Sequence, residues 1–208
     1  MKNDIEGPGG LKAFAKELVN RYFLGADAAR FSVVSFAENA TTRVPWSYDA
    51  AVINAGIDQI SADGPTSISD GFEAAQQLFT DGGRAGATKI VLLLSDGEQT
   101  VDAAPGKTPT QTAIDAAALV KEMGVTVFAW GFGDDVSEGT LQQIATDPSK
   151  AIYEQDLAQL CDYLDELEAA ICNESPPLSP PPPSPPPPLS PCGDIDPTFC
   201  QNELPTSL

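Results

Sequence analysis

The chain has 208 residues and no histidine, and this absence excludes several kinds of site at once. Ser-His-Asp and Cys-His catalytic groups and all zinc sites with an imidazole ligand are excluded. The four cysteines include no C-x-x-C pair, so a cysteine zinc site or a thioredoxin-like motif has no support. No segment reaches the roughly 18 consecutive apolar residues of a membrane span. The first ten residues, MKNDIEGPGG, lack the apolar core of a signal peptide.

Basic residues are also scarce. Eleven Lys and Arg stand against 30 Asp and Glu, which gives a formal net charge of −19 and an isoelectric point near 4.1. Phosphate backbones and anionic membranes would repel such a chain, so nucleic acid is not expected as a partner. Cations, or partners with basic patches, suit it better. Hydrophobic residues make up 42% of the sequence, which is enough for a substantial core.

What the chain does have is an alternation of helix and strand patterns. The spacing of apolar residues predicts helices at about 11–24, 49–57, 68–80 and 111–123, within SEGTLQQIA, and from Asp156 onward. Strands are predicted at 31–37, 41–48, 89–94, 125–131 and 151–155. This alternation is typical of an α/β fold with a doubly wound, mostly parallel sheet flanked by helices. We expect 31–37, 89–94 and 125–131 to be its inner strands.

Three local features refine this picture. The apolar run Ile90–Leu94 is typical of a strand buried on both faces. Pro45 places its strand at a sheet edge, because proline has no N–H to donate. Ser67 and Asp70 have the spacing of a capping box for the helix that follows.

The composition changes completely after residue 174. Residues 175–191, SPPLSPPPPSPPPPLSP, predict a stiff polyproline II linker, because proline fixes φ and cannot donate a hydrogen bond. Residues 192–208 form a short tail with two cysteines. We therefore expect an α/β domain at 1–174, a linker, and a tail too short to be a domain.

Asp96 follows a buried-strand pattern, and ligands of open α/β sheets bind beyond the carboxyl ends of the strands. Taken alone, Asp96 before Gly97 is equally typical of a turn, and Thr66 of an ordinary loop. Glu98 and the pair Asp134-Asp135 are interpreted as solvated surface charge. An enzyme using Asp96 as a nucleophile, such as a hydrolase or phosphatase, would favour a D-x-D motif or a G-x-S-x-G elbow. Neither motif is present, so no enzymatic activity is expected.

Four segments, in order, resemble the von Willebrand factor type A domain, also called the integrin I-like domain. They are FSVVSFAENA, GPTSISDGFEAA, IVLLLSDGEQT and GVTVFAWGFGDDVSEGTLQQIATDP, within a match from about residue 5 to 172. The resemblance implies a Rossmann-like fold with a metal-ion-dependent adhesion site. In that site, Mg²⁺ (or Mn²⁺ or Ca²⁺) is held by a D-x-S-x-S motif, a threonine and an aspartate. The threonine corresponds to Thr66 and the aspartate to Asp96, and an open metal position takes an acidic side chain of a protein ligand.

The chain departs from this pattern at its amino-terminal end. It contains no D-x-S-x-S and no strand ahead of the helix at 11–24, and the resemblance implies that this strand is central in the sheet. We expect the chain to be an incomplete copy whose missing motif lies upstream. As written, it should bind Mg²⁺ weakly or not at all.

Three features bear on the cellular location. Asn39-Ala40-Thr41 and Asn173-Glu174-Ser175 are N-glycosylation sequons, although Pro176 weakens the second. The Ser-Pro repeats resemble the hydroxyproline-rich spacers of plant and green-algal wall glycoproteins, the extensins and pherophorins. In an oxidising compartment, Cys192 and Cys200 are predicted to form a local disulfide. The alternatives are an unmodified linker in any compartment and cysteines that pair elsewhere.

Two functions remain after these exclusions. The first is an extracellular matrix or cell-wall adhesion module that binds a protein ligand from a proline-rich stalk. The alternative is an intracellular scaffold or regulatory subunit, since type A domains also serve in chelatase and transport complexes. The oxidation state of the cysteines and hydroxylation of the prolines would distinguish the two.

Overall fold

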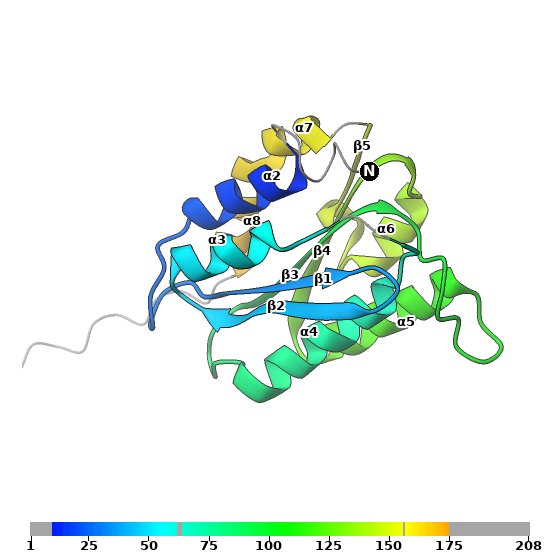
Figure 1. The fold of residues 1–208 in the computed structure, drawn as a ribbon, viewed down its shortest axis with the longest axis horizontal. Coiled ribbons are helices and arrows are strands. Elements are labelled where there is room, and N and C mark those ends of the chain that lie inside the picture. Colours follow the sequence, from blue (N-terminus) through cyan, green and yellow to red (C-terminus); the bar gives the residue numbers. More distant parts are fainter. Residues whose placement is uncertain (1–9, 62–63, 156, 175–208) are drawn as a thin grey trace, which may run out of the picture. The chain divides into compact units, whose positions relative to one another are not determined.

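The computed structural model describes residues 10–61, 64–155 and 157–174, all within the first of two compact units, Met1–Pro176. The strands of this part form two separate sheets (Figure 1). An antiparallel hairpin consists of β1 (Phe31–Phe36) and β2 (Ala40–Ser47). A parallel sheet has the order β3-β4-β5, with β3 at Lys89–Gly97, β4 at Val125–Asp135 and β5 at Ala151–Glu154.

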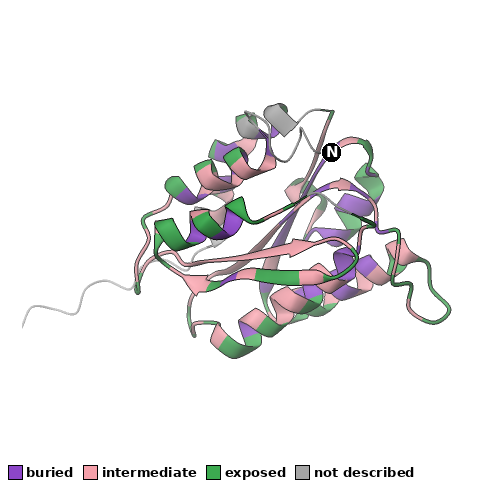
Figure 2. Cartoon of the chain, in the orientation of Figure 1, coloured by how far each residue is buried: buried purple, intermediate pink, exposed green. Residues whose placement is uncertain are grey.

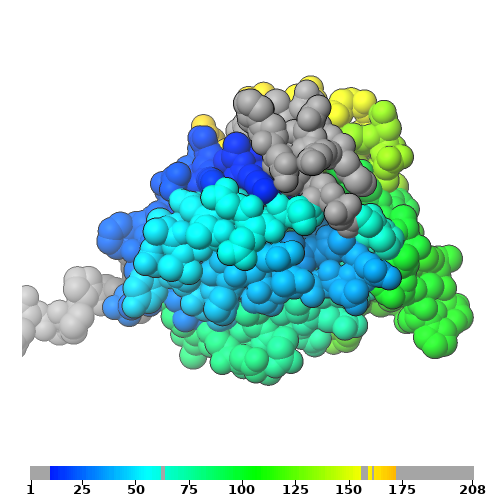
Figure 3. Space-filling model, in the orientation of Figure 1, coloured from blue at the N-terminus to red at the C-terminus, as the bar shows by residue number. Residues whose placement is uncertain are grey.

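Helices cover both faces of these strands, as expected for a doubly wound fold (Figure 1). On one face lie α2 (Leu11–Asn20), α3 (Ala50–Asp58), α7 (Leu157–Leu160) and α8 (Leu164–Glu174). On the other lie α4 (Ile68–Gly82), α5 (Pro109–Glu122) and α6 (Glu138–Ile144). A 3-10 turn, η1 (Pro148–Lys150), leads into β5. The space-filling view shows α3, the hairpin and α4 as one continuous surface (Figure 3).

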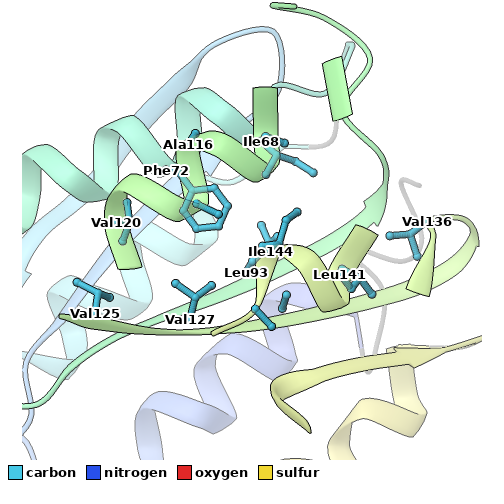
Figure 4. Close-up of a cluster of buried hydrophobic side chains, with 14 of the residues drawn as sticks. Ile68, Phe72, Leu93, Ala116, Val120, Val125, Val127, Val136, Leu141 and Ile144 are labelled. Carbon is cyan, nitrogen blue, oxygen red and sulfur yellow. The ribbon is translucent and has the colours of Figure 1, made fainter. Parts of the chain in front are cut away.

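Side chains alternate between the two faces along each central strand, as the period of a strand requires. On β4, Val125, Val127 and Ala129 pack under α4, α5 and α6, whereas Phe128, Trp130 and Phe132 pack under α2, α7 and α8. The first of these cores also contains Ile68, Phe72, Val120, Leu141 and Ile144 (Figure 4). The core therefore has two layers, one on each side of β4.

One expectation about the sheet is wrong. Of the three predicted inner strands only β4 has a neighbour on both sides, because β1 and β3 do not pair with each other. Among the described residues, no strand pairs with β1 on the side away from β2, or with β3 on the side away from β4. Within the described residues, therefore, no strand joins the hairpin to the parallel sheet.

The missing neighbour changes the burial of β3. Ile90, Val91, Leu92 and Leu94 are only half-buried, and Leu93 alone of this run is buried. On β4 the corresponding run from Val127 to Trp130 is at most 3% exposed. Every residue of β1 is half-buried as well (Figure 2). The apolar run of β3 has the sequence of an inner strand in the position of an edge strand.

Although β1 and β3 do not pair with each other, they run in the same direction. At their carboxyl ends, the Ser67 N–H donates to the Ala37 carbonyl (2.7 Å), and the Thr100 N–H donates to the Thr66 carbonyl (2.8 Å). At the opposite end, Arg30 Nη2, just before β1, donates to the carbonyl of Gly82 (2.8 Å), seven residues before β3 begins. Hydrogen bonds near both ends of α4 therefore hold β1, and those just before α4 also hold the segment after β3.

Two further predictions concern the strand that contains Pro45 and the final helix. Pro45 does lie on an edge strand, because β2 pairs with β1 alone among the described strands. The final helix is not continuous: a 3-10 turn, η2 (Cys161–Tyr163), separates α7 from α8. Its predicted apolar face is nevertheless kept, with Leu160, Leu164 and Leu167 at most 2% exposed. Asp156, the proline-rich segment, Cys192 and Cys200 lie outside the described residues.

Candidate metal and ligand site

Thr66 and Asp96 lie at the same end of the sheet. The loop that carries Thr66 is bonded to the segment after β3 in both directions: Thr66 N–H donates to Thr100 Oγ1 (2.9 Å), and Thr100 N–H donates to the Thr66 carbonyl (2.8 Å). Asp96 is the penultimate residue of β3, four residues before Thr100. Both Thr66 and Asp96 are half-buried.

The backbone around Asp96 is not a simple turn. The pairing of β3 with β4 shifts here: Ser95 is opposite Gly131, but Gly97 is opposite Asp135. Ser95 is buried, and its hydroxyl donates to the Gly97 carbonyl (2.6 Å). Irregularities of this kind re-aim side chains at sheet edges and next to functional sites. Asp96 therefore sits at a fixed bend of the strand and not in a free loop.

Gln99 holds the first turn of α4, and no pattern in the sequence predicted this role. Its side chain is 4% exposed. Its Oε1 accepts the Ser69 N–H (2.7 Å), and its Nε2 donates to Ser69 Oγ (2.9 Å) and to the Val101 carbonyl (2.9 Å). A buried amide with these partners holds the first turn of α4 to the segment after β3, because breaking these bonds leaves buried polar groups unpaired.

The capping box predicted for α4 is wrong. Ser67 is the N-cap, but its side chain accepts no bond from the helix, and its hydroxyl lies 3.3 Å from that of Ser69. One of the N–H groups of the first turn, that of Ser69, instead donates to the side chain of Gln99, in the segment after β3. A helix N-terminus needs such an acceptor, and here a residue 30 positions away in sequence supplies it.

Glu98 is not solvated surface charge, contrary to expectation. It is half-buried, and its two carboxylate oxygens accept from Thr140 Oγ1 (2.8 Å) and Thr110 Oγ1 (3.2 Å). Its N–H donates to the Asp135 carbonyl (3.0 Å). Glu98 thus joins β3 to α5 and α6. The prediction of solvated surface charge is correct for Asp134 and Asp135, which are exposed.

The described residues do not make a complete metal shell. Within them, no group of three or more Asp, Glu, Cys or His side chains is placed to hold a metal ion. Thr66 and Asp96 offer one hydroxyl and one carboxylate, whereas Mg²⁺ prefers six oxygen ligands. The two residues fit part of a hard-cation site, and the remaining positions would need further oxygen ligands.

This fold agrees with a family match. Residues 9–166 match the model of the von Willebrand factor type A domain. The chain belongs to this family. Its similar proteins include a UPF0353 protein of Mycolicibacterium paratuberculosis, which is 30% identical over 160 residues, or 74% of this chain and 44% of that one. They also include the mouse collagen alpha-4(VI) chain, which is 25% identical over 149 residues, or 70% of this chain and 6% of that one.

One similar solved structure contains a bound metal ion. Proximal thread matrix protein 1 of the mussel byssus, with a zinc-occupied metal-ion-dependent adhesion site, is 28% identical, with a TM-score of 0.65 over 77% of this chain and 40% of that one. Type A domains therefore bind divalent metals. The present chain spans less than half the length of each of these three proteins.

The bonds of Glu98 predict a structural role for it. We expect Glu98→Ala to lower the free energy of unfolding by about 1–3 kcal/mol, because Thr110 and Thr140 lose their shared acceptor. Glu122→Ala, at an exposed position on α5, is the matched control and should change it by about 0.5 kcal/mol or less. Urea unfolding of both variants measures the difference. Equal effects would show that the Glu98 bonds contribute nothing to stability.

Proposed function

We propose that this type A domain is an extracellular adhesion module that binds a protein ligand through a divalent metal at the carboxyl edge of its sheet. The observation that supports this most directly is the fixed juxtaposition of the Thr66 loop with the strand end of Asp96. The similarity to a collagen chain and to a byssal matrix protein supports a matrix role. Residues that bind and bridge are sufficient for this function, so no catalytic role is assigned to Asp96.

The metal in this proposal is Mg²⁺, with Mn²⁺ or Ca²⁺ as alternatives. Thr66 would supply a hydroxyl and Asp96 a carboxylate, both of which suit a hard cation. A D-x-S-x-S motif upstream of these 208 residues would supply further oxygens. An acidic side chain of the partner protein would take the remaining position. The metal would act as a bridge between two proteins.

The matrix or cell-wall location rests on the tail and on the sequons. Asn39 is exposed in the turn between β1 and β2, where a glycan could be attached without disturbing the fold. Asn173 lies near the end of α8. The Ser-Pro segment and the proposed Cys192–Cys200 disulfide would belong to a stalk in an oxidising compartment. Over residues 10–61, 64–155 and 157–174, none of the helices combines the length and apolar character needed to cross a bilayer.

Because the described residues offer only Thr66 and Asp96 as proposed ligands, magnesium should have little effect on the stability of the 208-residue protein. A ligand that binds only the folded state stabilises it by RT ln(1 + [L]/Kd). At millimolar Mg²⁺, a site with a Kd near or above millimolar adds about 0.4 kcal/mol or less. Melting curves with magnesium and with chelator measure this increment. A large shift that Asp96→Ala abolishes would mean that other oxygens, with Glu98 and Asp70 the first to test, complete the site.

Adhesion itself is tested with a protein in which a strand ending in D-x-S-x-S is fused ahead of Leu11. We expect Mg²⁺-dependent attachment to isolated cell-wall and matrix preparations, lost with chelator and in Asp96→Ala. The matched control is Asp134→Ala, an exposed aspartate near the same edge, which should attach as the parent does. Attachment that persists in chelator and in Asp96→Ala would exclude the metal bridge.

A further inference from the structure

The turn between β1 and β2 combines a glycosylation sequon with a position at the carboxyl end of β1. Asn39 lies in this turn, and Thr41 is the second residue of β2. Both residues are exposed. An N-linked glycan is bulky and stays in solvent, so an exposed turn of this kind is where one fits.

Hydrogen bonds place this turn against the loop of Thr66. Within the turn, the Ala37 N–H donates to the Asn39 carbonyl (3.2 Å), and the Ala37 carbonyl accepts the Ser67 N–H (2.7 Å). Ser67 follows Thr66 directly, and the Thr66 N–H donates to Thr100 Oγ1 (2.9 Å). Two residues of chain span at most about 7 Å, so a glycan on Asn39 would begin beside the loop proposed to hold the metal.

The opposite side of the metal edge, the carboxyl edge of the sheet with Thr66 and Asp96, stays free of glycan. No asparagine occurs between Asn54 and Asn173, so neither the loop after β3 nor the end of β4 can carry an N-glycan. A glycan on Asn39 would therefore cover the hairpin side alone.

This asymmetry bears on the shape of the partner. A stable interface between two globular proteins covers about 800 Å² of each, which requires contact on both sides of the metal. An extended segment needs only a narrow strip of surface, and the side along the loop after β3 and the end of β4 provides one.

We propose that Asn39 carries an N-glycan that shields the hairpin side of the metal edge and restricts its ligand to an extended segment bearing the acidic side chain. This inference rests on the proposed function, both for the metal edge and for passage through a secretory pathway. The shielding itself needs neither metal nor ligand. It is therefore measured in chelator, where its failure is distinguishable from failure of the adhesion site.

The experiment uses the 208-residue protein with a secretion signal and Pro65→Cys, since Pro65 is exposed and adjoins Thr66. The probes are three maleimides: a small dye, a dye on an extended peptide, and a folded globular protein. Peptide mass mapping reports glycan on Asn39, and labelling at position 65 apart from the four natural cysteines. We expect the glycan to slow the globular probe about tenfold and the peptide probe by about twofold or less.

Two substitutions at one position provide the matched comparison. Thr41→Val removes the sequon and keeps a β-branched residue in β2, whereas Thr41→Ser retains the sequon. The globular probe should regain its full rate in Thr41→Val and stay slow in Thr41→Ser. Adding Ala85→Asn and Ala87→Thr to Thr41→Val moves the glycan to the turn before β3, at the amino end of the strands, and should leave position 65 open.

Four outcomes would overturn the proposal. The first is secreted protein without glycan on Asn39, and the second is equal labelling of Thr41→Val and Thr41→Ser by the globular probe. The third is equal slowing of the peptide and globular probes, because the glycan would then close the metal edge to extended ligands as well. The fourth is equal slowing by the glycan before β3, which would be an effect of any glycan and not of its place on Asn39.

Discussion

Fusing a strand that ends in D-x-S-x-S ahead of Leu11 is expected to stabilise the protein by about 3 kcal/mol or more, even with chelator present. The physical reason is the arrangement of β1, β3 and α2. A parallel strand between β1 and β3 would bury the half-exposed apolar run of β3 and satisfy the free amides of both edges. It would then continue into α2, which would become the crossover helix of a βαβ unit ending in β1.

The same fusion should create a second, separable effect. D-x-S-x-S would add oxygens to those of Thr66 and Asp96, so Mg²⁺ should now give a further stability increment that Asp96→Ala abolishes. Melting curves of the short and fused proteins, each with magnesium and with chelator, separate the two contributions. Asp134→Ala serves as the exposed-aspartate control. A fused protein no more stable than the short one in chelator would contradict the proposed place of the strand.

Gln99→Leu is expected to lower the free energy of unfolding by about 2–4 kcal/mol. Leucine fills a similar volume but leaves the Ser69 N–H and the Val101 carbonyl without their partner in a buried place. The α4 N-terminus also loses the acceptor that replaces its N-cap side chain. Chemical denaturation measures the loss.

The matched control for this substitution is Gln142→Leu. Gln142 is exposed on α6 and bonds only Glu138 among the described residues, so we expect a change within about 0.5 kcal/mol. In the fused protein, Gln99→Leu should also weaken the magnesium increment, because the bonds between the first turn of α4 and the segment after Asp96 are lost and only the Thr66–Thr100 bonds remain. An unchanged magnesium increment would limit Gln99 to a structural role.

The location of strands and helices followed from the sequence because it depends on local periodicity. Apolar spacing predicted all five described strands and the helices between them, and Pro45 predicted the edge position of β2. The resemblance of four segments to the type A domain implied that Thr66 and Asp96 lie at one end of the sheet, and the loop of Thr66 does bond Thr100, four residues after Asp96.

The tertiary structure alone decided what each polar side chain does at that edge. Ser67 and Asp70 have the local spacing of a capping box, yet the cap comes from Gln99, because that side chain is buried against α4 by the fold. Glu98 was predicted to be surface charge, but in the folded protein it accepts hydrogen bonds from two threonine hydroxyls, one on α5 and one on α6. Such contacts join residues 12 to 42 positions apart, and no local pattern encodes them.

The burial of β3 also depends partly on its own sequence and partly on the tertiary structure. Its five apolar residues determined that it forms a strand between two helical layers, since the composition of a strand sets which faces it can bury. Whether those residues are buried depends on a neighbouring strand, and this chain leaves the position beside β3 unpaired among its described residues. Sequence determined the strand, and only the assembled sheet determined its exposure, because burial is a property of the neighbours and not of the segment.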